Sequence, residues 1–161
     1  MKKIIYILIF YSAYANAQIA KESITNVLVN WHLAAANANF TDYMSAMTED
    51  AIYIGTDATE NWTKQQFMAF AKPYFDKGKA WSFTTLERHI YLSKDQKTAW
   101  FDELLNTQMK ICRGSGVLIK VKSGWKIQHY VLSMTIPNDN SNEVIKIKTI
   151  IEDKLIEKLG K

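Results

Sequence analysis

The chain has 161 residues, of which 20 are Lys or Arg and 16 are Asp or Glu, and its formal net charge is +4. Such a small excess of positive charge gives no basis for predicting nucleic-acid binding. Cys112 is the only cysteine, which excludes an internal disulfide, so stability must come from packing. The length suits one compact domain with its own hydrophobic core.

Residues 1–17 have the pattern of a secretory signal peptide. Two lysines precede an apolar run from Ile4 to Phe10, and Ala15-Asn16-Ala17 supplies the small residues of a cleavage site. The apolar run is too short to cross a bilayer, so it does not predict a membrane anchor. We therefore expect a periplasmic or secreted protein whose mature part, residues 18–161, is a single domain without membrane contact.

The first half of the mature chain reads as three helices and one strand. Apolar spacing predicts a long amphipathic helix over residues 20–37 and a short helix over residues 41–47. A β-rich segment at residues 51–55 predicts a strand. The pair Thr63 and Gln66 forms a capping box, so a third helix is expected to begin directly after Thr63.

Alternating residues between positions 82 and 107 predict two antiparallel strands. The favoured register sets Arg88 opposite Asp102. In this register Asp102 lies beside Trp100 on the apolar, buried face, and Glu103 alternates to the surface or to a dimer interface. An ion pair with Arg88 would make Asp102 a structural residue.

Residues 113–137 predict one long β-hairpin. A three-residue loop, Lys122-Ser123-Gly124, would bring the apolar residues of both arms onto one face. The same face then carries Arg113, Ser115 and His129, either as the floor of a pocket or as satisfied core groups. A charged helix with an apolar stripe follows, which completes an α+β plan with helices on one face of a curved sheet.

Five short motifs occur along the chain in a recognisable order. They are Glu49-Asp50-Ala51, Tyr53-Ile54-Gly55-Thr56-Asp57, Ala99-Trp100-Phe101-Asp102-Glu103, Arg113-Gly114-Ser115-Gly116-Val117 and Gly124-Trp125-Lys126-Ile127. Over essentially the whole mature chain, this order resembles the SnoaL-like branch of the nuclear transport factor 2-like superfamily. The resemblance implies a cone-shaped α+β fold, in which a strongly curved antiparallel sheet wraps around the N-terminal helices and a C-terminal helix is added. It also implies a cavity between sheet and helices, and often a homodimer joined through the sheets.

The superfamily includes ketosteroid isomerase, scytalone dehydratase and polyketide cyclases, and also members without known activity, so the resemblance alone does not give a function. In the isomerases the proton-shuttling carboxylate lies at the end of the first strand. Gly55 takes that place here, and Asp57 could substitute only if its loop folds inward.

His129 and Asp102 form the candidate catalytic pair. A neutral imidazole in a cavity can act as acid or base near neutral pH, and a buried carboxyl group has a raised pKa unless it is paired. The alternatives are a structural, half-buried His129 and a structural ion pair of Asp102 with Arg88 or Arg113. The residues predicted to bind a ligand are Tyr43, Asp57, Trp62, Arg88, Trp100, Arg113 and Ser115.

Together these features predict a protein that binds a small, largely apolar molecule. The enzymatic hypothesis is acid-base chemistry such as isomerisation, hydration or hydrolysis, and the alternative is a non-catalytic ligand carrier or dimeric scaffold. His32, His89 and Cys112 have no spacing that suits a metal site, so neither a metal nor a cofactor is predicted.

Overall fold

The computed structural model describes the backbone of residues 2–160 and the side chains of residues 16–160. The helices are α1 (Lys2–Ala36), α2 (Phe40–Ser45), α3 (Lys64–Asp76) and α4 (Ser141–Leu159), with a 3-10 turn η1 (Asn138–Asn140) before α4. The strands are β1 (Met47–Ile54), β2 (Asn61–Thr63), β3 (Thr84–Leu92), β4 (Thr98–Thr107), β5 (Lys110–Val121) and β6 (Gly124–Met134). The predicted signal peptide lies almost entirely outside the side chains described, and it stays a prediction.

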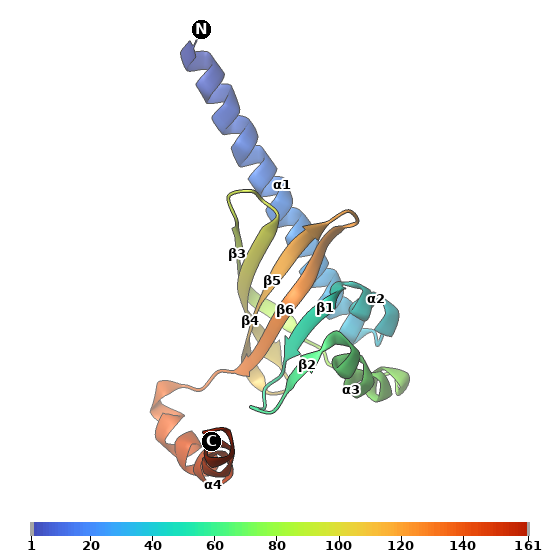
Figure 1. The fold of residues 1–161 in the computed structure, drawn as a ribbon, viewed down its shortest axis with the longest axis vertical. Coiled ribbons are helices and arrows are strands. Elements are labelled where there is room, and N and C mark those ends of the chain that lie inside the picture. Colours follow the sequence, from blue (N-terminus) through green and yellow to red (C-terminus); the bar gives the residue numbers. More distant parts are fainter. Residues whose placement is uncertain (1, 161) are drawn as a thin grey trace.

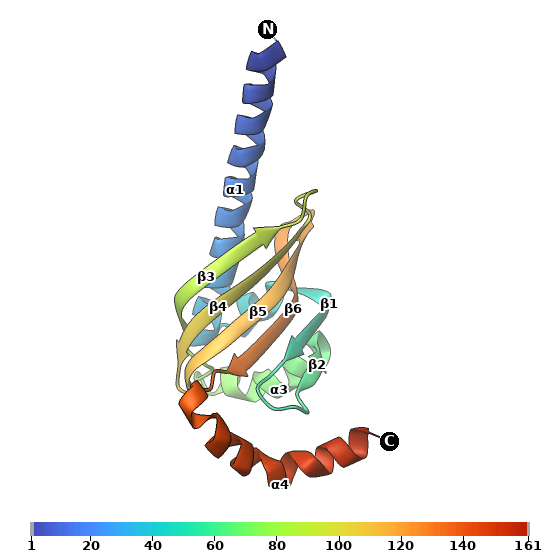
Figure 2. The same cartoon turned by 90° about the vertical axis from the view of Figure 1, so that its left-hand side faces the viewer.

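The strands form one six-stranded sheet in the order β2-β1-β6-β5-β4-β3. Helix α1 crosses one face of this sheet, and the opposite face is covered by no helix of the described chain (Figures 1 and 2). The predicted α+β fold is confirmed. One detail differs, because β1 runs parallel to β6 and the sheet is therefore mixed rather than wholly antiparallel.

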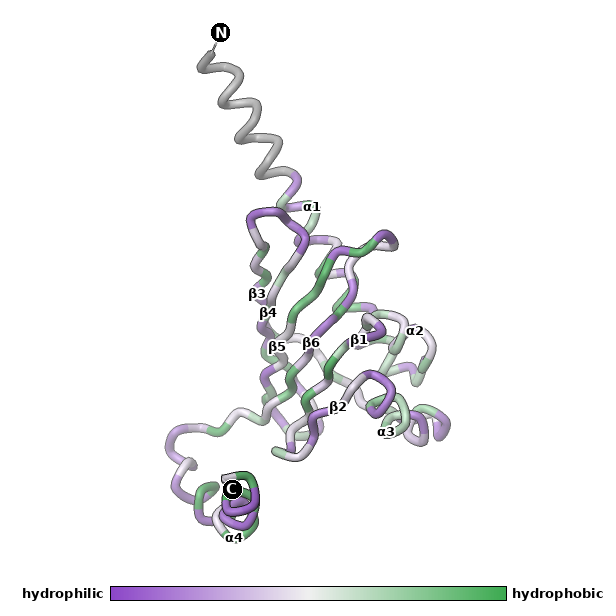
Figure 3. The backbone as a smooth tube through the Cα atoms, in the orientation of Figure 1, coloured by the Kyte–Doolittle hydropathy of each residue, from purple (hydrophilic) through white to green (hydrophobic). Residues whose placement is uncertain are grey.

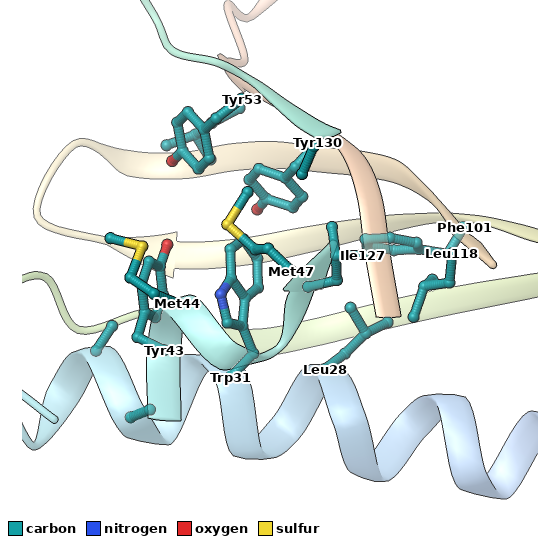
Figure 4. Packing of buried hydrophobic residues seen from close by; sticks show 14 of the residues in the cluster. Leu28, Trp31, Tyr43, Met44, Met47, Tyr53, Phe101, Leu118, Ile127 and Tyr130 are labelled. Atoms are coloured by element: carbon teal, nitrogen blue, oxygen red, sulfur yellow. The ribbon is translucent and has the colours of Figure 1, made fainter. Parts of the chain in front are cut away.

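The hydrophobic core lies between α1 and the inner face of the sheet. Ile24, Leu28 and Trp31 recur at helical spacing and are almost fully buried. Leu28 points toward Leu118 of β5, and Trp31 packs edge-on against Tyr130 of β6, with ring centroids 4.7 Å apart (Figure 4). Burying each such side chain stabilises the fold by about 1.5–3 kcal/mol.

Helix α3 follows the predicted capping box. The Thr63 side chain accepts a hydrogen bond from the Gln66 backbone, and the Gln66 side chain accepts one from the Thr63 backbone. Phe67, Ala71 and Phe75 form the buried stripe of this helix. The stripe sets α3 against β1, at one end of the sheet.

The predicted loop of the β5–β6 hairpin is wrong. Val121 pairs with Gly124, so the loop has two residues, and a bulge between Val117 and Leu118 then shifts the register. Trp125 and Ile127 face the core as predicted, but Val117, Ile119, Val121, Arg113, Ser115 and His129 lie on the outer face. The inner face of β5 instead carries Cys112, Gly114, Gly116 and Leu118.

The two glycines explain this choice of face. A Cβ atom on Gly116 would lie 2.8 Å from Phe101 Cε1, and one on Gly114 would lie 2.4 Å from the Tyr130 hydroxyl oxygen. Both separations are shorter than real carbon contacts allow. Large aromatic rings therefore fill the space above these glycines, and the hairpin must present its glycines to the core.

The register predicted for β3 and β4 is wrong by one residue. Arg88 pairs with Glu103 and not with Asp102. Because side chains alternate along a strand, this shift exchanges the two faces. Glu103 is buried at 1 % exposure, and Asp102 faces outward.

Candidate functional site

A cavity of about 150 Å³ opens at the end of the sheet where β1, β4 and β6 finish. Six aromatic side chains line it, together with a few aliphatic and polar groups. The aromatic residues are Tyr53, Trp62, Phe67, Phe70, Trp81 and Phe83, and the others are Gly55, Thr56, Glu60, Gln108, Met109 and Leu132. A cavity of this size can hold one benzene-sized group.

Four of the rings form a continuous stack along one side of the cavity. Tyr53 of β1 stacks on Phe67 of α3 with a centroid distance of 3.8 Å. Trp62 of β2 lies 5.9 Å from Phe67 and 4.6 Å from Phe70. The capping box at Thr63, the residue after Trp62, starts α3, so Phe67 and Phe70 follow Trp62 within the first turns of the helix. One short segment therefore supplies three of these rings. The stack gives the cavity a rigid, apolar wall.

Among the described residues that line the cavity, Glu60 is the only charged one. The loop after β1 folds back so that the Glu60 carboxylate lies beside Gly55. A Cβ atom on Gly55 would come within 2.1 Å of Glu60 Oε2, so only glycine leaves room for the carboxylate here. The same oxygen accepts a hydrogen bond of 3.1 Å from the Asp57 backbone N–H.

The Glu60 carboxylate therefore lies beside the end of the first strand. The sequence did not point to this residue, because only the closed loop brings it back to Gly55. Asp57 itself is exposed, and its Oδ1 accepts hydrogen bonds from the Thr59 backbone and hydroxyl, which lower the pKa of Asp57.

Tyr53 borders both the core and the cavity. Burial raises the pKa of its hydroxyl, and the nearby negative charge of Glu60 raises that pKa further. The hydroxyl therefore stays protonated and neutral across the physiological pH range. Among the described residues that line the cavity, Glu60 supplies the only carboxylate.

A second polar cluster is closed inside the core. Glu103 Oε1 accepts a hydrogen bond of 2.8 Å from His32 Nε2, and Glu103 Oε2 accepts one of 2.6 Å from Arg88. Burial alone would raise the pKa of Glu103, but the hydrogen bonds and charges of His32 and Arg88 outweigh it and hold the pKa below its usual value. Glu103 and His32 were missed from the sequence because the predicted register pointed Glu103 outward.

The candidate catalytic pair lies on the outer face of the sheet. His129 is half-buried opposite Val117, and Asp102 lies opposite Ser115 on the next strand. Asp102 Oδ1 is 3.0 Å from Nδ1 of His89, and this contact raises the pKa of His89. The buried placement predicted for His129 and Asp102 is wrong, since the bulge and the one-residue shift turn both outward; their catalytic role stays a prediction.

The other predicted binding residues separate into three places. Trp62 lines the cavity, and Tyr43 is buried in the core, stacked 4.9 Å from Trp31. Trp100 is 47 % exposed and stacks on Tyr91, with the ring centroids 5.9 Å apart. Arg113 and Ser115 lie on the same outer face as Trp100, and Arg88 belongs to the buried cluster.

No group of three or more His, Cys, Asp or Glu side chains in the described part of the chain is arranged to hold a metal ion. Among the same residues, no helix combines the length and the hydropathy needed to cross a membrane.

Comparisons with known proteins agree with this architecture. The sequence profile of the SnoaL-like domain matches residues 24–137. A comparison with curated proteins finds no significant match.

Solved structures share the fold at low sequence identity. An NTF2-like protein of unknown function from Pseudomonas putida KT2440 is 11% identical, with a TM-score of 0.65, and covers 76% of this chain and 92% of its own. An NTF2-like protein from Cytophaga hutchinsonii ATCC 33406 is 15% identical, with a TM-score of 0.60 and coverages of 71% and 98%. A provisionally assigned scytalone dehydratase from Novosphingobium aromaticivorans DSM 12444 is 10% identical, with a TM-score of 0.65 and coverages of 76% and 89%. The chain thus belongs to the SnoaL-like domain family of the NTF2-like superfamily.

Proposed function

We propose that this protein binds a small, largely apolar molecule in the cavity between α3 and the sheet. The observation that carries the proposal is a cavity of about 150 Å³ whose wall holds six aromatic side chains and a single carboxylate. Aromatic walls with few polar groups are typical of small-molecule sites, because the rings supply contact area and the polar group orients the ligand.

Binding without catalysis is the function that the polar groups favour. Glu103 is fully enclosed by His32 and Arg88, and a buried, mutually satisfied cluster of this kind serves the structure rather than a substrate. His129 and Asp102 face away from the cavity wall. Among the described residues of the wall, Glu60 supplies the only carboxylate, and Tyr53, which stays protonated, supplies no second base to complete a proton relay.

Acid-base catalysis is the second candidate, and the position of Glu60 favours it. Its carboxylate lies beside the end of the first strand, next to Gly55. A provisionally assigned dehydratase of the NTF2-like family from Streptomyces avermitilis shares the fold with a TM-score of 0.62. Under this alternative Glu60 moves the proton, so Glu60→Gln would abolish turnover of any substrate found. If the protein is a carrier without catalytic activity, Glu60→Gln should at most lower its affinity for the ligand.

Calorimetric titration with three small probes tests the binding proposal: phenol, benzyl alcohol and tetramethylammonium, all close to benzene in size. Met109→Trp, in the turn between β4 and β5, fills the cavity with an indole ring and is expected to weaken binding at least about tenfold. Leu86→Trp adds the same ring on β3, away from the cavity, and should bind like the unmodified protein. The proposal is overturned if none of the three probes binds, or if Met109→Trp binds as tightly as Leu86→Trp.

Export and dimerisation are part of the same proposal. The basic start and apolar run of residues 1–17 support secretion or a periplasmic location, which N-terminal sequencing of protein from expressing bacteria would test.

Exposed Tyr91 and Trp100 on the uncovered sheet face support a homodimer through the sheets. Trp100→Glu should then convert a dimer to a monomer in analytical ultracentrifugation.

A further inference from the structure

We infer that the ligand of this cavity carries a positive charge, in the form of a small alkylated ammonium group. The inference rests on the proposed function, since it requires that the cavity binds a small molecule. It goes further by naming the chemical class of that molecule, and the charges, rings and size of the cavity wall each support it.

The charges on the cavity wall are one-sided. Glu60 contributes a carboxylate, and the lining residues include no Lys, Arg or His. An anionic ligand would meet repulsion from Glu60 without any compensating cation. The wall therefore selects against carboxylates and phosphates and favours neutral or cationic ligands.

Among the described residues, the Glu60 carboxylate has no cationic partner. Its Oε2 atom accepts the Asp57 backbone N–H, and none of the ion pairs among the described side chains includes Glu60. By contrast Glu103, a fully buried carboxylate of β4, is held by both Arg88 and His32. A half-buried carboxylate gains most from an opposite charge, so a cationic ligand would supply what the protein itself does not.

The aromatic wall selects in the same direction. The faces of aromatic rings carry negative electrostatic potential and attract organic cations, and quaternary ammonium groups are commonly bound by clusters of aromatic side chains. Tyr53, Trp62, Phe67 and Phe70 form the stacked wall, and Trp81 lies 5.9 Å from Phe67 at a tilt of 38°. The lining rings therefore differ in tilt, and a cation would bind where a ring face is not covered by another ring.

Size limits the cation to a small group. About 150 Å³ suits a benzene-sized group, which is also the scale of a trimethylammonium head. A wider, open region outside the cavity shares Gly55, Thr56 and Glu60 with it and is also lined by α4, including Lys148, Lys154 and Lys158. A polar tail attached to the head group could extend past Glu60 into this region. Choline has this shape, with a compact cationic head and a short hydroxyl tail.

The test compares choline with 3,3-dimethyl-1-butanol, which has the same shape with a carbon atom in place of the charged nitrogen. We expect choline to bind the full-length protein about tenfold more tightly in isothermal titration calorimetry. In Glu60→Gln this preference should fall to within about twofold. Gln retains an oxygen that can accept the Asp57 N–H, so the variant is expected to fold, and its thermal unfolding checks this.

Glu87→Gln is the matched control, because it removes one negative charge from the exposed face of β3. It should keep the full preference for choline. Equal or tighter binding of the neutral alcohol, or a preference that survives in Glu60→Gln, overturns the inference and leaves the binding proposal intact. Binding of phenol without any binding of choline would also overturn the inference and leave the binding proposal intact. Failure of every neutral and cationic probe overturns both.

Discussion

Two carboxylates affect two different properties of this protein, its stability and the ligand binding proposed for its cavity. Glu103 is a carboxylate closed inside the core and fully paired, whereas Glu60 is a carboxylate at a cavity wall with only a backbone partner. The first pattern is that of a structural ion cluster. The second leaves bonding capacity for a ligand. Substitutions at these two positions should therefore have different consequences.

Glu103→Ala should destabilise the protein strongly. Removing the carboxylate leaves Arg88 and His32 buried without their partner, and breaking such a cluster costs about 3–5 kcal/mol. Urea unfolding followed by circular dichroism measures the change. Asp102→Ala is the control, because that side chain is 40% exposed and its loss should change stability by about 0.5 kcal/mol or less. A loss below about 1 kcal/mol for Glu103→Ala would show that the cluster does not stabilise the fold.

The same cluster predicts a dependence of stability on pH. The pKa of Glu103 in the folded state lies below its usual value of 4.5, so its contribution is complete above that value and is lost as the pH falls through the folded pKa. Urea unfolding between about pH 6 and about pH 3 should show a smaller decline for Glu103→Gln than for the unmodified protein. Identical declines would mean that Glu103 has the same pKa in both states.

Gly55→Ala should alter the cavity without unfolding the protein. The new methyl group would lie 2.1 Å from Glu60 Oε2, and the end of a flexible side chain can move away where backbone cannot. The displaced carboxylate should weaken choline binding about as much as Glu60→Gln does, with a small change in melting temperature. Unchanged choline affinity would indicate that the position of Glu60 is not set by Gly55.

At the scale of elements, the hairpin of β5 and β6 shows why strand faces were predicted incorrectly. Both arms alternate apolar and polar residues, so two registers bury apolar side chains. The bulge between Val117 and Leu118 lets Trp125 and Ile127 remain inside while His129 turns outward. A bulge of this kind has no clear signature in a single sequence. Gly114 and Gly116 were the available signal, since glycines that alternate on one strand mark a face where large rings approach closely.

Helix α4 is the element with the least connection to the rest of the molecule. None of its residues is buried, and Ile147, Ile150 and Ile151 are each more than 70 % exposed. Figures 1 and 2 show it beyond the end of the sheet, and Figure 3 shows hydrophobic and hydrophilic residues mixed along it. The match to the SnoaL-like domain also ends before it, at residue 137.

A stop codon after Pro137 should therefore leave the stability of the domain almost unchanged. Differential scanning calorimetry should give a melting temperature within about 3 °C of that of the full-length chain, because α4 contains no buried residue. A much larger decrease would show that α4 packs on the body of the protein in solution. A full-length sample measured in the same buffer is the control.

At the scale of the whole molecule, the sequence predicted the kinds of elements, their order and the family well. Helical spacing, the capping box at Thr63 and the strand alternation depend on local chemistry, which a single sequence records. Which polar residues meet in space depends on register and loop closure. Because the register differs by one residue, Glu103 and not Asp102 lies opposite Arg88. Because the loop after β1 folds back, Glu60 and not Asp57 lies beside Gly55. Trp62, which the sequence predicts to bind a ligand, lines the cavity, and its part in binding stays a prediction.

The proposed function requires that a ligand enters the cavity between α3 and the sheet. Nuclear magnetic resonance of the indole N–H groups tests it most directly, because the five tryptophans lie at distinct places in the fold. In separate titrations with choline and with phenol, we predict that the signals of Trp62 and Trp81 shift, and that those of Trp100 and Trp125 stay unchanged. Shifts confined to Trp100 on the outer face of the sheet, or no shift with either compound, would contradict the claim.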